Sequence, residues 1–364
     1  MISQIFNPLE VQIVKVFFLC ASALTLAFLW APILIKFLFR YQLWRKKART
    51  KAIDGKPADV FYGLHKEREV SVPRLGGVLI WVTVILVAFI FAILSRIFPD
   101  SFWLSKLDFL TCGQSCRGQT WLPLAALLAA SLLGLGDDVL QIFNKGGYKA
   151  GGITFTRRFL AVLFIGIVGA IWFYTKLDFN TLHLPFVGDI AIGFWYIPLF
   201  ILTVLACWSG GVIDGIDGLA GGVFGIIFMA FGIISFADAQ FNLAAFCFVV
   251  AGALMAFLWF NIPPAKFYMG ETGVIGLTAT LAVVAFLSNS VLVLPIIGGL
   301  LVVEAGSVII QLLAKKFLKR KVFLCAPFHH HLEAKGWLPQ QITMRFWLIN
   351  IAIAIVGIAI RLIG

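Results

Sequence analysis

Acidic residues are scarce in this 364-residue chain, with 17 Asp and Glu against 29 Lys and Arg, so their positions carry information. Five of them stand at glycine-rich breaks between long apolar segments. A single acid at a membrane boundary is commonly a solvated loop end, whereas five acids in such breaks favour one shared site. The five are Asp137, Asp138, Asp214, Asp217 and Glu271.

The spacing of these acids indicates how they are arranged. Asp214 and Asp217 are three residues apart and therefore share one face of a helical turn. Asp137 and Asp138 are neighbours, about 100° apart on a helix, so they point in different directions unless the helix ends there. We expect the neighbours to have different tasks and to lie at the aqueous boundary, where their loss disturbs little packing.

A carboxylate cluster repels a phosphate-bearing substrate unless a divalent cation stands between them. Hard oxygen ligands beside a phosphate suit Mg²⁺, which keeps several waters and takes one or two carboxylates. The nearby glycines permit close backbone approach, and helix starts offer N–H groups to phosphate. Helix packing by small residues in lipid is a second reading of the glycines, compatible with the first. The cluster therefore favours metal-assisted phosphoryl chemistry.

The stretch "APFHHHLEAKGW" holds three of the five histidines, His329, His330 and His331. The prolines and the glycine around them predict a loop or a short helix at the membrane face. Three adjacent histidines cannot converge on one zinc ion, and H-x₃₋₅-H and C-x₂-C spacings are absent here. Purely structural histidines remain an alternative. We favour imidazoles that donate hydrogen bonds to a phosphate or sugar, with charge assistance when protonated.

The elements that position these groups follow from composition. The chain is 61% hydrophobic, against roughly 45–50% in ordinary soluble domains. Since about 20 apolar residues span a bilayer, we expect an all-α, polytopic membrane protein. The first apolar run is too long for a cleaved signal and lacks a positive n-region. Ten segments qualify as spans, at about 11–39, 75–98, 121–136, 159–175, 191–210, 219–236, 243–260, 274–290, 291–313 and 346–362.

Basic residues predict the orientation, because cytoplasmic loops retain Lys and Arg. One side collects 22 of the 29 Lys and Arg, in loops 40–74, 137–158, 211–218, 261–273 and 314–345. That side is expected to be cytoplasmic and to carry the active site, with both termini outside. The net charge of +12 is then a topology signal and an attraction to anionic membrane lipid, and we exclude a nucleic-acid partner.

Cysteine usage adds one structural expectation. Of the six cysteines, Cys112 and Cys116 lie in an outward loop and could form a disulfide in an oxidising compartment. The others are scattered and pack as small hydrophobes. Internal repeats and low-complexity tracts are absent from the sequence, so residues 1–364 are expected to form a single transmembrane domain.

Four motifs occur in a recognisable order: "GDD" at 136–138, "DGIDGLAGG" at 214–222, "NIPPAKFYMGETG" at 261–273, and "VVEAGSVIIQ" through "APFHHHLEAKGW" at 302–337. With them the chain resembles the phospho-N-acetylmuramoyl-pentapeptide transferases (MraY type). These form a branch of the polyprenyl-phosphate N-acetylhexosamine-1-phosphate transferases, glycosyltransferase family 4. The resemblance runs across almost the whole chain. The histidine motif is the most specific part, since other branches of the superfamily typically lack it.

The resemblance implies an enzyme of the bacterial inner membrane. Undecaprenyl phosphate would attack the β-phosphate of UDP-MurNAc-pentapeptide, giving undecaprenyl-diphospho-MurNAc-pentapeptide (lipid I) and UMP, the first membrane step of peptidoglycan synthesis. One phosphoanhydride replaces another, so catalysis should consist mostly of positioning and charge neutralisation. A homodimer is a further partner that we leave open.

The resemblance also implies residue roles. Glu271 would ligate Mg²⁺, and Asp137 with Asp138 would orient or deprotonate the lipid phosphate. His329 and His330 would contact the phosphate or sugar of the donor. The remaining substrate-binding residues are Asp214, Asp217, Asn261 and His331. The first three would shape the nucleotide site, and His331 would brace the loop.

Three departures from the family pattern bear on donor choice. The family's threonine-rich "TPTMGG"-like segment is "SVPRLGG" here, at 71–77; its aspartate in "MGDTG" is Glu271; and its amide three residues before Asp214 is Gly211. The first departure favours a sister transferase that uses UDP-GlcNAc or a related donor, whereas the histidines disfavour it. A transporter or scaffold would need charges near the bilayer midplane, and Glu304 is the deep candidate; its simpler reading is a buried, hydrogen-bonded acid.

Overall fold

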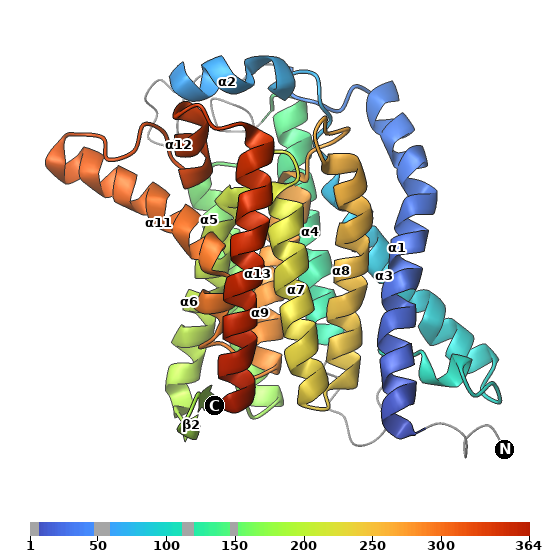
Figure 1. Ribbon diagram of the computed structural model, residues 1–364. Coiled ribbons are helices and arrows are strands. Elements are labelled where there is room, and N and C mark those ends of the chain that lie inside the picture. Colours follow the sequence, from blue (N-terminus) through green and yellow to red (C-terminus); the bar gives the residue numbers. More distant parts are fainter. Residues whose placement is uncertain (1–6, 47–58, 111–119, 146–151) are drawn as a thin grey trace.

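The computed structural model describes residues 7–46, 59–110, 120–145 and 152–364. Within these ranges nine helices are long and apolar enough to cross a membrane. They form an upright bundle (Figure 1). The nine are α1 (Pro8–Arg40), α3 (Gly77–Ile97), α4 (Trp121–Ile142), α5 (Phe155–Lys176), α6 (Tyr196–Gly210) taken with its flanking turns as Gly193–Ile213, α7 (Leu219–Ala237), α8 (Phe241–Asn261), α9 (Gly270–Leu287) and α13 (Pro339–Ile363).

Shorter elements connect these helices. A hairpin of two antiparallel strands joins α5 to α6, and single turns flank α6. The short elements are α2 (Asp59–Glu69), η2 (Leu104–Lys106), β1 (Thr181–Leu184), β2 (Gly188–Ala191), η3 (Gly193–Trp195), η4 (Gly211–Ile213), α10 (Leu294–Ile297), α11 (Gly299–Leu313), η5 (Ala314–Leu318) and α12 (Phe328–Ala334). The expectation of an all-α, multi-pass membrane protein is confirmed.

The expected ninth span, 291–313, is not a single long helix. It consists of α10 and α11, which meet at Gly298. The adjacent pair Gly298 and Gly299 accounts for the break. At 15 residues, α11 is about 22 Å long, shorter than the roughly 30 Å hydrocarbon core of a bilayer, and it continues directly into η5. The segment 291–313 is therefore not among the nine helices of the described residues that are long and apolar enough to cross a membrane.

The predicted loop boundaries also need correction. Loop 137–158 was expected to begin at Asp137, but α4 continues to Ile142 because its apolar positions continue past the acids and Ile142 is buried. Loop 314–345 ends earlier, since Pro339 begins α13, a favoured position for proline. Loops 40–74 and 314–345 contain the short helices α2 and α12.

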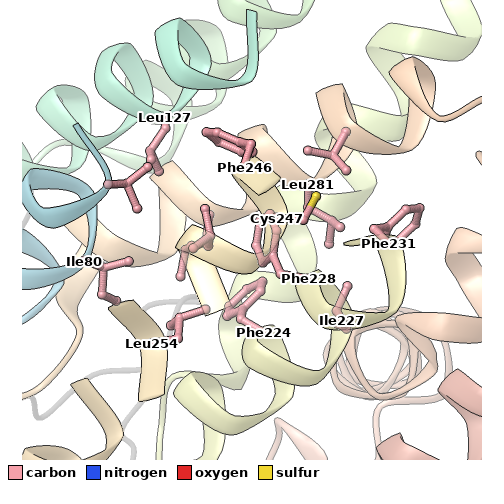
Figure 2. Close-up of a cluster of buried hydrophobic side chains, with 14 of the residues drawn as sticks. Ile80, Leu127, Phe224, Ile227, Phe228, Phe231, Phe246, Cys247, Leu254 and Leu281 are labelled. Carbon is pink, nitrogen blue, oxygen red and sulfur yellow. The ribbon is translucent and has the colours of Figure 1, made fainter. Parts of the chain in front are cut away.

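The core lies around α9, which is buried along almost its entire length. Small residues on α9 permit close packing against α4, in keeping with helix association in membranes. Figure 2 shows the large side chains that complete this core; those labelled are Ile80, Leu127, Phe224, Ile227, Phe228, Phe231, Phe246, Cys247, Leu254 and Leu281. Four cysteines are free thiols, Cys20, Cys207, Cys247 and Cys325; the pair Cys112 and Cys116 lies outside the described residues.

The two ends of the bundle differ. Helices α2 and α12 lie at one end, together with the end of α4, while the start of α1, the end of α13 and strand β2 lie at the other (Figure 1). We refer to the first as the α2/α12 end. Its predicted loops hold most of the basic residues, so we expect it to face the cytoplasm.

Cysteine labelling checks this orientation. In a cysteine-free background, Lys66→Cys on α2 and Lys335→Cys after α12 should react only from the cytoplasmic side, since both positions are exposed. The matched control is Val187→Cys, an exposed position between β1 and β2, which should react only from outside. Labelling of Lys66→Cys or Lys335→Cys from outside would reverse the orientation.

Candidate active site

The sequence-predicted residues come together at the α2/α12 end, where α4 ends, α9 begins and α5 begins. The segment 211–218 after α6 and the segment 262–269 between α8 and α9 complete the site. The positively charged side chains Arg74 and Arg158 enter from the start of α3 and the first turn of α5.

Asp137 is fully buried and surrounded by donors. Its Oδ1 accepts a hydrogen bond from the backbone N–H of Ile153 at 2.6 Å, and its Oδ2 accepts from Gln141 Nε2 at 2.8 Å. Arg158 lies 2.6 Å from the same Oδ2. The position expected at an aqueous boundary is wrong, because α4 continues past Asp137 and neighbouring segments cover it. Asp137 is thus a fixed carboxylate with a neutralising partner.

Asp138 is also fully buried, and it faces a different set of groups. Its Oδ2 accepts from the backbone N–H of Thr272 at 2.9 Å, in the first turn of α9. Its Oδ1 lies 3.7 Å from Arg74 and has no hydrogen-bond partner among the described residues. Here too the expected aqueous position is wrong. The two neighbours point at different partners, as the geometry of adjacent helical residues requires.

Glu271 is partly accessible, with a side chain that is 23% exposed. Its Oε1 lies 2.5 Å from Arg158 Nη1. The same guanidinium therefore joins Glu271 to Asp137. Arg158 holds the end of α4 and the start of α9 together by charge, beside the place where Asp138 contacts α9.

Asp214, Asp217 and Asn261 organise the two loops beside this cluster. Asp214 Oδ2 accepts from the N–H of Gly270 at 3.2 Å, and Asp217 Oδ2 accepts from the N–H of Ala265 at 3.3 Å. Asn261 bridges the loops, because its Oδ1 accepts from Gly218 N–H and its Nδ2 donates to a carbonyl in the 262–269 segment. These contacts fix the shape of the loops.

The charge state of Asp214 depends on its surroundings. Burial raises the pKa of Asp214 to about 6, and the nearby Arg74 guanidinium opposes that rise. Glu271 lies close enough to raise the pKa further. Because burial and like charge both disfavour ionisation, this part of the site favours a bound cation.

His329 is held by Glu304, and both side chains are fully buried. The carboxylate accepts from the backbone N–H of His329 at 3.2 Å and lies 3.0 Å from its Nδ1. The other ring nitrogen, Nε2, is buried without a hydrogen-bond partner among the described residues. A side chain at position 215 would collide with this nitrogen. Because Gly215 has no side chain, the imidazole can lie against the 211–218 segment. Glu304, noted from sequence as a deep acid, therefore has a hydrogen-bonded role in orienting His329.

His330 and His331 have distinct environments. Burial, together with the neighbouring His329, lowers the pKa of His330 to about 3, so this imidazole is neutral at neutral pH. His330 Nδ1 lies 2.5 Å from the Glu333 carboxylate and must donate to it, which leaves Nε2, near Gly215, as an acceptor. His331 Nδ1 accepts from Leu324 N–H at 3.1 Å, a contact within the loop.

Several residues of the site were missed by sequence reasoning. Arg74 lies in the unusual "SVPRLGG" segment, and Arg158 lies in the first turn of α5. Both are basic residues in loops predicted to lie on the same side as the acids, and this is the signal by which they could have been found. Glu333 follows His330 by three residues, which is one helical turn. Gln141 follows Asp137 by four residues and Thr272 follows Glu271 directly.

The departure at Gly211 has a local packing reason. A side chain built on Gly211 would collide with Val274 of α9. The amide that the family carries at this position would therefore not fit unless the Val274 side chain moved. The contact that the amide would make is absent here, and α9 packs against the turn instead.

The donors present suit Mg²⁺. Carboxylate oxygens are its preferred protein ligands, and one of them, Asp138 Oδ1, is a buried oxygen without a hydrogen-bond partner among the described groups. Glu271 is partly accessible from outside. Glu271 and Asp138 are thus the residues that would hold the ion, with Asp214 close by.

Residues 120–289 match the family model of glycosyl transferase family 4, a region that includes all five acids. The phospho-N-acetylmuramoyl-pentapeptide-transferase of Chloroflexus aurantiacus is 37% identical over 309 residues, which cover 81% of this chain and 78% of the relative. The protein of that name from Levilactobacillus brevis is 36% identical over 242 residues, covering 66% of this chain and 73% of the relative. That from Pelagibacter ubique is 32% identical over 317 residues, covering 81% of each.

Proposed function

Because this chain belongs to glycosyl transferase family 4 and is a multi-pass membrane enzyme of its phosphoglycosyl transferase type, we propose that it transfers phospho-MurNAc-pentapeptide to undecaprenyl phosphate. The donor is UDP-MurNAc-pentapeptide, and the products are lipid I and UMP. The proposed location is the bacterial inner membrane, with the α2/α12 end in the cytoplasm. The homodimer stays a prediction.

One observation carries this proposal: the histidine helix α12 lies directly against the turn that holds Asp214 and Asp217. His329 and His330 both approach Gly215 of that turn. The histidine motif is the feature most specific to the muramoyl branch, and this contact connects it to the acid cluster at which phosphoryl chemistry is expected. A donor bound at the turn would therefore meet the imidazoles and the carboxylates together.

In the proposed reaction an oxygen of the lipid phosphate attacks the β-phosphorus of the donor. The new P–O bond forms as the bond to the UMP oxygen breaks, and UMP leaves with those electrons. A phosphate monoester has its second pKa near 6, so the nucleophile is largely ionised at neutral pH. Orientation of the lipid phosphate by the Asp137 and Asp138 region should then matter more than removal of a proton.

Charge neutralisation is the main task of the site. When bound, Mg²⁺ would stabilise negative charge developing on the phosphoryl oxygens. Arg158 offsets the charges of Asp137 and Glu271, and Arg74 lies beside Asp138, so the carboxylates do not present an unscreened negative surface to the diphosphate. Asn261 holds the 211–218 and 262–269 segments in register for the nucleotide.

Donor selection is the proposed task of α12. The neutral His330 has its Nε2 lone pair toward the turn, so it would accept a hydrogen bond from a sugar hydroxyl or amide rather than bind a phosphate by charge. The unpartnered Nε2 of His329 is the second group available to the donor. Both imidazoles are fixed from behind by carboxylates, Glu304 and Glu333.

Turnover of radiolabelled donors by the purified protein with polyprenyl phosphate tests the proposal. UDP-MurNAc-pentapeptide and UDP-GlcNAc should be compared side by side, with release of UMP as the readout. Preference for the muramoyl donor supports the proposal. Preference for UDP-GlcNAc would instead support the sister transferase, and absence of turnover on both would support a transporter or scaffold.

We expect His329→Ala and His330→Ala each to lower kcat/KM for UDP-MurNAc-pentapeptide by roughly 10- to 150-fold. That range corresponds to about 1.5–3 kcal/mol, which lies within the cost of about 1–3 kcal/mol for leaving a buried hydrogen-bonding group of the donor without its partner. His331→Ala should have a smaller effect, because its contact lies within the loop. The matched control is His183→Ala on the opposite end of the bundle, where the imidazole pairs with Asp189. Wild-type kinetics in all three α12 variants would make these histidines structural.

A further inference from the structure

A second group of metal-ligating side chains lies beside α12, on the side that the donor contacts do not use. His65 of α2 faces His330 and Glu333 of α12, and one ligand atom from each lies within 4.8 Å of the other two. The two imidazole rings are 4.9 Å apart, centroid to centroid. From this geometry we propose that His65, His330 and Glu333 form a binding site for a divalent transition metal of the Zn²⁺ class.

The types of donor argue for this class of metal. Two imidazole nitrogens and one carboxylate oxygen are common Zn²⁺ ligands, and three protein ligands leave a fourth position for water. Mg²⁺ prefers oxygen ligands throughout, so this site and the Glu271 region favour different ions. The sequence excludes a zinc ion bound by all three adjacent histidines. The site proposed here is a different one, because only His330 of these three belongs to it.

Two of the three distances between ligand atoms can be compared with those of a tetrahedral site. Bonds of 2.0–2.2 Å place neighbouring ligand atoms about 3.3 Å apart. His65 Nε2 and Glu333 Oε2 are already 3.2 Å apart. His330 Nδ1 and Glu333 Oε2 are 2.5 Å apart and would have to separate by about 0.8 Å to share one metal ion. His330 and Glu333 share one face of α12, since they are three residues apart.

Metal binding requires an ionised carboxylate and neutral imidazoles. The proton on His330 Nδ1 would move to Nε2 when the metal binds Nδ1, because a neutral imidazole carries one proton.

The site has a structural consequence. Helix α2 lies across the end of the bundle and α12 stands beneath it (Figure 1), so a bound metal would join two elements that are 268 residues apart along the chain. It would also change His330 Nε2 from an acceptor to a donor toward the Gly215 turn. Metal occupancy would therefore couple the position of α2 to the group that His330 presents to the donor.

Metal binding without turnover tests this site independently of the proposed function. The full-length protein in detergent, stripped of metal, is titrated with Zn²⁺ against a chromophoric chelator, and with Co²⁺ while visible absorption is recorded. We expect one tight equivalent of Zn²⁺ and the intense visible bands of four-coordinate Co²⁺. His65→Ala should weaken Zn²⁺ binding by more than about 100-fold, beyond the 10- to 100-fold effect of changing an outer partner.

Two further variants make the result specific. Glu333→Gln should remove the same equivalent, whereas His183→Ala, in the hairpin at the opposite end, should leave it intact. If Glu333→Gln fails to fold, His65→Ala still decides, because His65 is partly exposed on a short surface helix. Wild-type Zn²⁺ affinity in His65→Ala, or equal loss in His183→Ala, would overturn the proposal and leave the three side chains as a hydrogen-bonded network.

Discussion

Glu271→Gln is expected to lower the rate of phosphoryl transfer by about three orders of magnitude while the protein remains folded. The substitution keeps the size of the side chain and an oxygen that can still accept from Arg158, which lies 2.5 Å away in the wild type. It removes the negative charge by which Glu271 would hold Mg²⁺. Charge neutralisation by a metal is worth several kcal/mol, and about 4 kcal/mol corresponds to a thousandfold in rate.

The measurement is the rate of UMP release as a function of Mg²⁺ concentration. Glu271→Asp keeps the charge on a shorter side chain and should retain part of the activity, as the family's usual aspartate at this position would suggest. Glu10→Gln is the matched control, because Glu10 is also an acid in the first turn of a helix, but at the start of α1. Normal turnover by Glu271→Gln at limiting Mg²⁺ would place the metal elsewhere.

Asp138→Asn is expected to lower turnover by more than about 100-fold and also to destabilise the protein. The sequence alone suggests that little packing would be disturbed, but Asp138 is fully buried and accepts from Thr272 N–H. An amide at this position would place N–H donors near Arg74. The amide oxygen can still accept from Thr272 N–H, but a hydrogen bond to a charged group, worth about 1.5–3 kcal/mol, becomes one between neutral groups, worth about 0.5–1.5 kcal/mol. The apparent melting temperature should therefore fall together with the rate.

Size-exclusion retention after heating gives the stability, and UMP release gives the rate. Asp189→Asn is the control for stability, because that carboxylate lies in the hairpin at the opposite end and is 60% exposed; it should change neither quantity. Asp137→Asn should behave like Asp138→Asn, since Asp137 is equally buried and paired with Arg158. Full activity in either variant would limit that residue to a structural role.

The amino-acid sequence by itself determined the class of fold and the family. Long apolar segments require helices in lipid, because only hydrogen bonds within a segment satisfy the backbone there. The order of the "GDD", "DGIDGLAGG" and "NIPPAKFYMGETG" motifs indicated the family, which the matched family region and the relatives confirm. Apolar segments and motifs are both local features of the sequence. They can therefore be recognised without knowing which segments contact one another in the fold.

The tertiary structure decided which groups face one another. Asp137 and Asp138 look like helix-end acids in the sequence, yet packing of α4 against α9 buries both and supplies their partners from Arg158, Thr272 and Arg74. Gly298 divides the expected span 291–313, because a local break stops a helix even where the apolar composition continues. Hydrophobicity specifies that a helix is buried in lipid. It does not specify which neighbouring helix packs against each of its faces.

The contacts of the histidines give the clearest case. Their spacing excludes one metal held by all three, and this conclusion is correct for adjacent residues. His65 is separated from Glu333 by 268 residues and still lies 3.2 Å from its carboxylate, a distance set only by the way α2 crosses the end of the bundle. Spacing rules describe ligands carried on one element, whereas side chains from two elements meet only where the packing of the helices brings them together.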